Sequence, residues 1–95
     1  MKCSTKVLVK CKNGIHLRTA SHLIGLLKGF NQKVWIRKGS LRIDARSILG
    51  ILMLQAKKGT SLKLEAYGDK CSGAIETLRD FFNDKEVCFD EKEEF

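Results

Sequence analysis

The sequence predicts an α+β domain in which three helices cover one face of a mainly antiparallel four-stranded sheet. Three observations lead to this prediction. Residues 61–66 alternate strictly between apolar and polar side chains, which is typical of a strand in a sheet covered on one face only. Residues 33–37 and 41–43 flank Lys38-Gly39-Ser40, which indicates a hairpin. Two further segments carry the apolar periodicity of helices, and a short apolar run after Ser47 indicates a third helix.

The expected order of elements is strand, helix, strand, strand, helix, strand, helix. The first strand covers 7–9, and the first helix follows His16 and ends at Lys28-Gly29, a basic last turn with a glycine stop. After the hairpin, Ser47 opens a short apolar helix over 48–54, and the strand 61–66 precedes a last helix that starts at Gly68-Asp69. The apolar face of that helix comprises Cys71, Ala74, Ile75, Leu78, Phe81 and Phe82. We divide the chain into a domain over 1–88 and an acidic tail over 89–95, which we expect to be mobile.

Composition favours a cytoplasmic protein. The 95 residues are enough for one core, no apolar run approaches the ~18–20 residues of a membrane span, and residues 1–6 lack the apolar region of a signal peptide. The four cysteines, Cys3, Cys11, Cys71 and Cys88, show no metal-binding spacing, so we expect no metal site and free thiols. Cys11 and Cys71 are in phase with core positions and are expected to be buried.

The net charge of +7 is unevenly distributed. Residues 1–64 carry 14 Lys and Arg against one acidic residue, whereas residues 65–95 carry 4 against 10. Such a basic body favours an acidic partner, a phosphate-bearing partner or nucleic acid. A solvated surface that only keeps the protein soluble is the plainer interpretation, and charge alone leaves these alternatives open.

The segment 13–20 joins a turn signal to a histidine at the start of a helix. Asn13-Gly14 is a strong turn signal, and a helix N-terminus presents backbone N–H groups and a positive dipole end that suit an anion. His16 is placed to receive a phosphoryl group there, with the N–H groups of Leu17 and Arg18 directed at its oxygens. The alternative, a surface histidine in a loop, remains open on spacing alone.

Several separated pieces together resemble the HPr family, the histidine-containing phosphocarrier proteins of the phosphoenolpyruvate-dependent sugar phosphotransferase system. The resemblance runs from about residue 5 to residue 82 and implies an open-faced β-sandwich, in agreement with the strand pattern. The pieces follow one another at the family's spacing: Asn13-Gly14-Ile15-His16-x-Arg18-x-Ala20, Lys28-Gly29-Phe30, Ser47-Ile48-Leu49-Gly50-Ile51-Leu52, Ala56-Lys57-Lys58-Gly59 and Ala66-Tyr67-Gly68.

The resemblance implies that His16 accepts the phosphoryl group through its Nδ1 atom and that Arg18 helps electrostatically. It implies a monomer without a bound cofactor that is charged by enzyme I, which consumes phosphoenolpyruvate, and that donates to an enzyme IIA. Phosphoryl transfer asks mainly for positioning and neutralisation of the phosphate oxygens, and the planar guanidinium of arginine holds two such oxygens at once.

Two residues depart from the family pattern. Thr19 stands where the family usually has proline in the first helical turn, and Leu17 stands where a small polar residue is common. The Thr19 hydroxyl either donates a hydrogen bond to the phosphate or has no role in the transfer. Both departures from the family pattern bear on the efficiency of phosphoryl transfer. The other histidine, His22, is expected to be structural or solvated.

Ser47 is the second candidate. From its position it is an ordinary helix N-cap. The resemblance implies regulation by a dedicated HPr serine kinase/phosphorylase, because phosphoserine adds roughly −1.5 to −2 charge, which opposes docking on an acidic partner. The helix after Ser47 is more apolar than one core face requires. We therefore expect a partner-binding surface with an apolar patch and a basic rim. The apolar members are Leu17, Ile48, Leu49 and Leu52, and the basic members are Arg18, Lys28 and Arg46. Burial of the apolar members under the acidic tail is the alternative.

Other classes of function fit less well. A nucleic-acid-binding domain would need more stacking aromatic residues than Trp35 and Tyr67, and no Gly-x-x-Gly loop is present, so no nucleic acid partner is expected. An independent enzyme would need a second catalytic group beside His16, and the sequence places none there. A regulatory relative, controlled at Ser47 and binding partners without efficient phosphoryl transfer, remains the alternative to a carrier.

Overall fold

The structure is a computed structural model that describes residues 1–11 and 14–83. The elements are β1 (Lys2–Leu8), α1 (Leu17–Leu27), β2 (Lys33–Lys38), β3 (Leu41–Asp44), α2 (Ile48–Met53), β4 (Ser61–Tyr67) and α3 (Cys71–Asn83). The predicted order is confirmed. The prediction for the first strand was too short, because β1 begins at Lys2 and pairs with β4 along its whole length. The proposed acidic tail and Cys88 lie outside the described residues.

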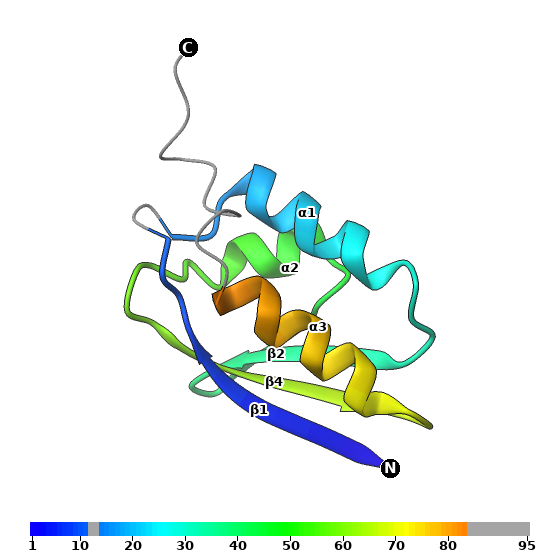
Figure 1. The fold of residues 1–95 in the computed structure, drawn as a ribbon. Coiled ribbons are helices and arrows are strands. Elements are labelled where there is room, and N and C mark those ends of the chain that lie inside the picture. Colours follow the sequence, from blue (N-terminus) through cyan, green and yellow to red (C-terminus); the bar gives the residue numbers. More distant parts are fainter. Residues whose placement is uncertain (12–13, 84–95) are drawn as a thin grey trace.

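The sheet is antiparallel throughout, with the strand order β1-β4-β2-β3. Figure 1 shows the three helices on the same side of this sheet. Alternate residues of a strand point to opposite faces, so Leu62 and Leu64 of β4 are buried towards the helices, while Lys63 lies on the open face. The predicted fold class, with one covered and one open sheet face, is confirmed.

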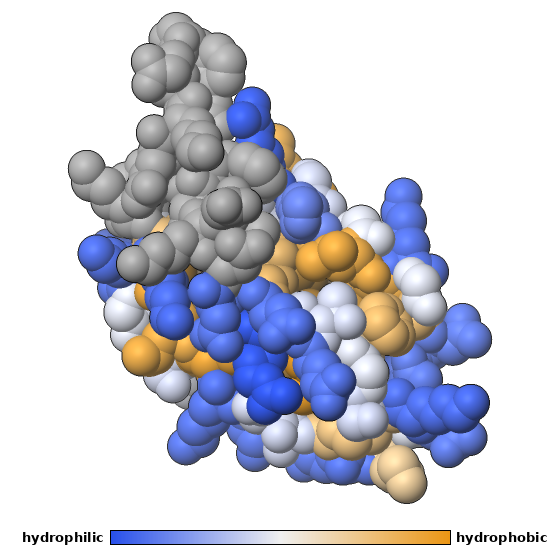
Figure 2. Space-filling view, viewed as in Figure 1, coloured by the Kyte–Doolittle hydropathy of each residue, from blue (hydrophilic) through white to orange (hydrophobic). Residues whose placement is uncertain are grey.

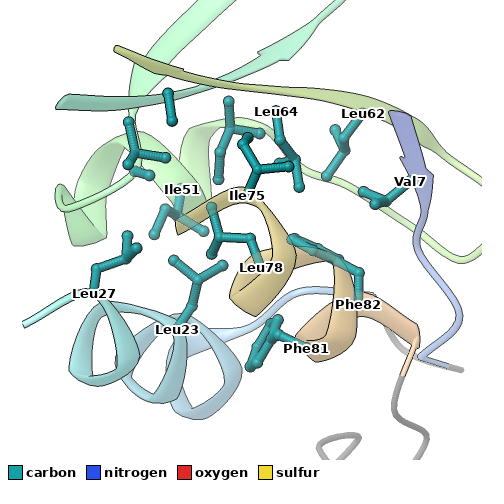
Figure 3. Close-up of a cluster of buried hydrophobic side chains, with 14 of the residues drawn as sticks. Val7, Leu23, Leu27, Ile51, Leu62, Leu64, Ile75, Leu78, Phe81 and Phe82 are labelled. Atoms are coloured by element: carbon teal, nitrogen blue, oxygen red, sulfur yellow. The ribbon is translucent and has the colours of Figure 1, made fainter. Parts of the chain in front are cut away.

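The core fills the space between the helices and the sheet (Figure 3). Leu23 and Leu27 of α1 meet Leu78 of α3 there, and all are fully buried. The rings of Phe81 and Phe82 pack edge to face, with centroids 5.2 Å apart. Burying a side chain of this size contributes about 1.5–3 kcal/mol. The predicted apolar face of the last helix is confirmed, since each of its members is buried.

A disulfide between Cys3 of β1 and Cys71 of α3 corrects the expectation of free thiols. β1 lies beside α3 in the fold, and the Cα atoms of the two residues are 5.9 Å apart, well within the range of a disulfide. Cys11 is also disulfide-bonded. The expected burial of Cys11 and Cys71 is confirmed. The bridge could not be predicted from the spacing of the cysteines, because it joins residues 68 positions apart.

Helices α1 and α2 run in opposite directions. The guanidinium of Arg46, just before α2, donates to the carbonyl of Leu27 at the end of α1. At the other end, the N–H of Ile15, just before α1, donates to the carbonyl of Ala56, just after α2. The end of α2 therefore adjoins His16, and the start of α2 adjoins the far end of α1.

The surface is mostly hydrophilic. Figure 2 shows polar and charged residues over most of the visible face, with smaller apolar areas among them. In the part of the chain that the structure describes, no helix has the length and apolar character to span a bilayer. The same residues contain no group of histidine, cysteine or acidic side chains that could hold a metal ion.

Candidate functional site

His16 is the N-cap residue of α1, as the sequence predicts. Its backbone is extended, with φ −124° and ψ −175°, and its carbonyl accepts the first helical hydrogen bond from the N–H of Ala20 at 2.8 Å. N-cap side chains commonly bond a backbone N–H of the first turn, but the His16 side chain makes no such bond. The residue is half-buried.

The turn before His16 is held close to the chain that follows α2. Gly14 has φ +77°, and its N–H donates to the carbonyl of Cys11 at 2.9 Å. The N–H of Ile15 donates to the carbonyl of Ala56 at 3.0 Å. A Cβ atom at residue 14 would overlap the same Ala56 oxygen. Gly14 is thus needed both for its backbone conformation and for the close approach that fixes the entry to α1. Asn13 of the predicted turn lies outside the described residues.

Thr19 contacts the imidazole directly. Its Oγ1 atom lies 3.3 Å from Nε2 of His16, one helical turn back along the chain. Thr19 is only 1 % exposed. The sequence indicated the departure from proline at this position but not the contact, because a hydroxyl three residues after a histidine has no unique partner.

Leu17 and Arg18 are exposed at the start of α1. They supply the first two backbone N–H groups of the helix, which have no acceptor within an α-helix. Arg18 is the second residue of the helix that His16 caps. The histidine, the helix N-terminus and a basic residue are therefore neighbours in the chain, and the anion site that the sequence predicts there stays a prediction.

Ser47 is the N-cap of α2, as the sequence predicts. Its Oγ accepts a hydrogen bond from the N–H of Gly50 at 3.0 Å, and the residue is half-buried. A Cβ atom at Gly50 would lie 3.1 Å from Cβ of Ile43 and 3.3 Å from Oγ of Ser47, so the glycine allows this tight first turn. Ser47 lies at the end of α2 that is remote from His16, since α1 and α2 are antiparallel.

The residues predicted to bind partners differ in how exposed they are. Leu17 is 58 % exposed and Leu49 is 74 % exposed, Lys28 is exposed, and Ile48 and Leu52 are half-buried. Met53, which the sequence interpretation passed over, is 65 % exposed at the end of α2 nearest His16. The apolar run 48–54 was the signal that could have identified it.

Arg46 differs from the other residues of the predicted basic rim. Its guanidinium donates to three backbone carbonyls, those of Gln32 at 2.8 Å, Phe30 at 2.7 Å and Leu27 at 3.2 Å. Charge-assisted bonds of this kind are stronger than those between neutral groups. The structure thus gives Arg46 a role within the fold, where it holds the chain after α1 against the start of α2.

His22, the second histidine, packs against α3. Its ring stacks on Phe81 of α3, with centroids 5.5 Å apart and an interplanar angle of 27°. This contact agrees with the structural role expected from the sequence.

Comparisons with known proteins identify relatives of this chain in sequence and in fold. The family model described as "PTS HPr component phosphorylation site" matches residues 3–84. The phosphocarrier protein HPr of Neisseria meningitidis is 35% identical over 72 residues, covering 76% of this chain and 81% of that protein. The fold is similar to that of HPr-C-His from Thermoanaerobacter tengcongensis, with a TM-score of 0.82, 29% identity and coverage of 98% and 99% of the two chains. It is also similar to Crh, a catabolite repression protein of Bacillus subtilis whose structure is described as a swapped dimer. That match has a TM-score of 0.70, 29% identity, and coverage of 83% of this chain and 91% of Crh.

Proposed function

Because the chain belongs to the HPr family of phosphocarrier proteins of the phosphotransferase system, we propose that His16 is its phosphoryl acceptor. The donor is enzyme I, charged by phosphoenolpyruvate, and the acceptor is a histidine of an enzyme IIA. A family member of this kind carries the group between partner enzymes and does not itself catalyse a reaction on a substrate. It needs no bound cofactor for this role.

The observation that carries the proposal is the position of His16 at the N-terminus of α1. A phosphoryl group on its ring would meet the positive end of the helix dipole. The backbone N–H groups of Leu17 and Arg18 are the donors for its oxygens, and the exposed Arg18 guanidinium neutralises their charge. These are the contributions that phosphoryl transfer requires of a protein.

The docking surface of the proposal combines the exposed apolar side chains of α1 and α2 with nearby cations. Leu17, Leu49 and Met53 are its most exposed apolar members, with Ile48 and Leu52 partly accessible and Lys28 at the basic rim. Arg46 supports this surface by fixing α2 against the end of α1. Apolar contacts with a surrounding basic field suit transient binding of acidic enzymes.

Incubation with enzyme I and phosphoenolpyruvate tests the proposal. We expect the mass of one phosphoryl group to be gained, and the gain to be labile to acid. His16→Ala should abolish the gain. His22→Ala is the matched control, since it removes the other histidine of α1 from its stacking contact with Phe81 and should leave the gain unchanged. A wild-type protein that gains no mass would reject the carrier role.

Ser47 is proposed as the regulatory site, modified by an HPr serine kinase/phosphorylase. Its hydroxyl is half-buried and already accepts the Gly50 N–H, so modification replaces a neutral cap by a charged one. Since Ser47 lies at the end of α2 remote from His16, the added charge acts through docking on the shared surface and not through contact with the imidazole.

We propose a monomer that works in the cytoplasm, where phosphoenolpyruvate is available. The Cys3–Cys71 disulfide is unusual for a reducing cytoplasm. Counting the free thiols of the protein isolated without reductant therefore tests this location. The regulatory alternative is favoured by one observation, the similarity to Crh. A protein that takes no phosphoryl group on His16 but changes partner binding with the state of Ser47 would be such a regulator.

A further inference from the structure

The contact between Thr19 and His16 is built from a residue with little freedom to move. Thr19 is 1 % exposed, and a β-branched side chain in a helix has few rotamers available. It lines a small cavity whose other walls are mainly apolar, including Val9, Phe81 and Phe82. Its Oγ1 is therefore held in place 3.3 Å from Nε2 of His16.

We infer that Thr19 is a positioning residue for phosphoryl transfer: its hydroxyl oxygen accepts a hydrogen bond from Nε2–H of His16 and so keeps the lone pair on Nδ1. The inference rests on the proposed function, because it concerns the same histidine. A neutral imidazole carries a proton on one nitrogen and a lone pair on the other. The Thr19 hydroxyl lies 3.3 Å from Nε2 and can donate or accept. If Nδ1 is the atom that attacks phosphorus, as the proposed function has it, the proton of the neutral ring is on Nε2, and the hydroxyl is then the acceptor that favours this tautomer.

The transfer step then needs no proton movement. The lone pair of His16 Nδ1 forms a bond to phosphorus, while the bond between phosphorus and the donor's nitrogen breaks and its electron pair leaves with the donor. Nε2 keeps its proton, and the ring gains positive charge. The hydrogen bond from Nε2–H to Oγ1 of Thr19 becomes stronger as that charge develops. Passing the group to the next protein reverses these changes.

The sequence position explains why threonine serves this purpose. Side chains three residues apart lie on the same side of a helix, so a residue in the first turn reaches back to the N-cap. Thr19 stands where the resemblance implies proline, which has no hydroxyl. In this chain a hydrogen bond therefore orients the imidazole from the position that otherwise only shapes the helix entry.

Two variants separate the hydroxyl from the shape of the side chain. Thr19→Val keeps the volume and suits the apolar walls of the cavity, so it should fold. Thr19→Ser keeps the hydroxyl and loses a methyl group. In the ¹⁵N-labelled, unphosphorylated protein at a pH where the ring is neutral, long-range proton–nitrogen NMR spectra distinguish the protonated from the unprotonated nitrogen of His16.

We expect Nε2 to be protonated in the wild type and in Thr19→Ser, and both tautomers to be populated in Thr19→Val. Transfer from enzyme I to Thr19→Val should be about five- to tenfold slower, the effect of losing one hydrogen bond. Thr19→Ser should stay within about twofold of the wild type. A wild-type ring protonated on Nδ1, or a Thr19→Val spectrum equal to that of the wild type, would overturn the inference. A wild type with the expected tautomer that takes no phosphoryl group would overturn the proposed function instead.

Discussion

Single residues at the entry to α1 determine how the imidazole is presented. Gly14 combines a positive φ with a contact to the Ala56 carbonyl that leaves no room for a Cβ atom. His16 follows two residues later, and Oγ1 of Thr19 lies 3.3 Å from Nε2 of its ring. The proposed phosphoryl acceptor is thus preceded by a constrained backbone turn and followed by a hydroxyl in contact with its ring.

Gly14→Ala should lower the free energy of unfolding by about 1–3 kcal/mol, because alanine is strained at this φ and must also displace the Ala56 carbonyl. Gly39→Ala is the matched control, since Gly39 has a φ of +59° but nothing within contact distance of an added Cβ. Urea denaturation measures both. A larger loss for Gly14→Ala, together with slower phosphoryl transfer, is expected; equal losses would show that the Ala56 contact is unimportant.

At the level of elements, α2 carries both the proposed regulatory residue and part of the proposed docking surface. Ser47 caps the helix through the Gly50 N–H, and the exposed Leu49 and Met53 follow on the same short helix. A charge at the cap therefore lies beside the surface on which partners are proposed to dock, while the antiparallel packing of α1 and α2 keeps it away from the imidazole.

Ser47→Asp should slow transfer to His16 without unfolding the protein, since aspartate is as good an N-cap as serine. Ser47→Asn is the control: asparagine has the size of aspartate and caps a helix equally well but adds no charge. The transfer rate of this variant should therefore stay close to that of the wild type. The transfer rate with enzyme I, measured at several concentrations of the carrier, should show the effect of aspartate mainly as weaker binding. Equal rates for Asp and Asn would remove charge as the cause.

A cluster of four ion pairs on the open face of the sheet is centred on Glu65 of β4. Glu65 is 2 % exposed, and its carboxylate lies 3.7–3.9 Å from the side-chain nitrogens of Lys2, Arg37, Arg42 and Lys63. The guanidinium of Arg42 also lies over the ring of Trp35, 4.1 Å from its centroid. One carboxylate thus compensates four cations drawn from four strands.

Glu65→Gln should destabilise the protein by about 1–3 kcal/mol, because it removes the only negative charge within these four ion pairs. The loss should shrink at high salt, which screens the repulsion among the partly exposed cations. Glu76→Gln, on the exposed side of α3, is the control and should change little. Denaturation curves at low and high salt provide the measurement, and a salt-independent loss would contradict the charge-based explanation.

For the whole molecule, the Cys3–Cys71 disulfide joins the first strand to the last helix. The double variant Cys3→Ala/Cys71→Ala should lower the free energy of unfolding by up to about 4 kcal/mol. This figure follows from the chain entropy that closing a loop across a sequence separation of 68 removes from the unfolded state. Urea denaturation of the oxidised wild type and of the variant gives the difference. If the two curves coincide, the bridge does not form in solution.

The sequence predicted the elements well because each has a local signal: alternation in β4, apolar periodicity in α3, and a capping serine before α2. The position of His16 at a helix start was predicted for the same reason. The misses are contacts between distant segments. The pairing of Cys3 with Cys71 and the reach of Arg46 to the carbonyls after α1 depend on how the elements pack, which no local pattern encodes.

The same bridge turns residues 3–71 into a closed covalent ring that contains all four strands, except Lys2 of β1, and the first two helices. A protease that cuts any peptide bond inside this ring therefore releases no fragment until the bridge is reduced. The exposed tip of the β2–β3 hairpin at Gly39-Ser40 lies within the ring. A chain nicked there keeps both of its pieces covalently joined, and the sheet and helices that present His16 remain one molecule.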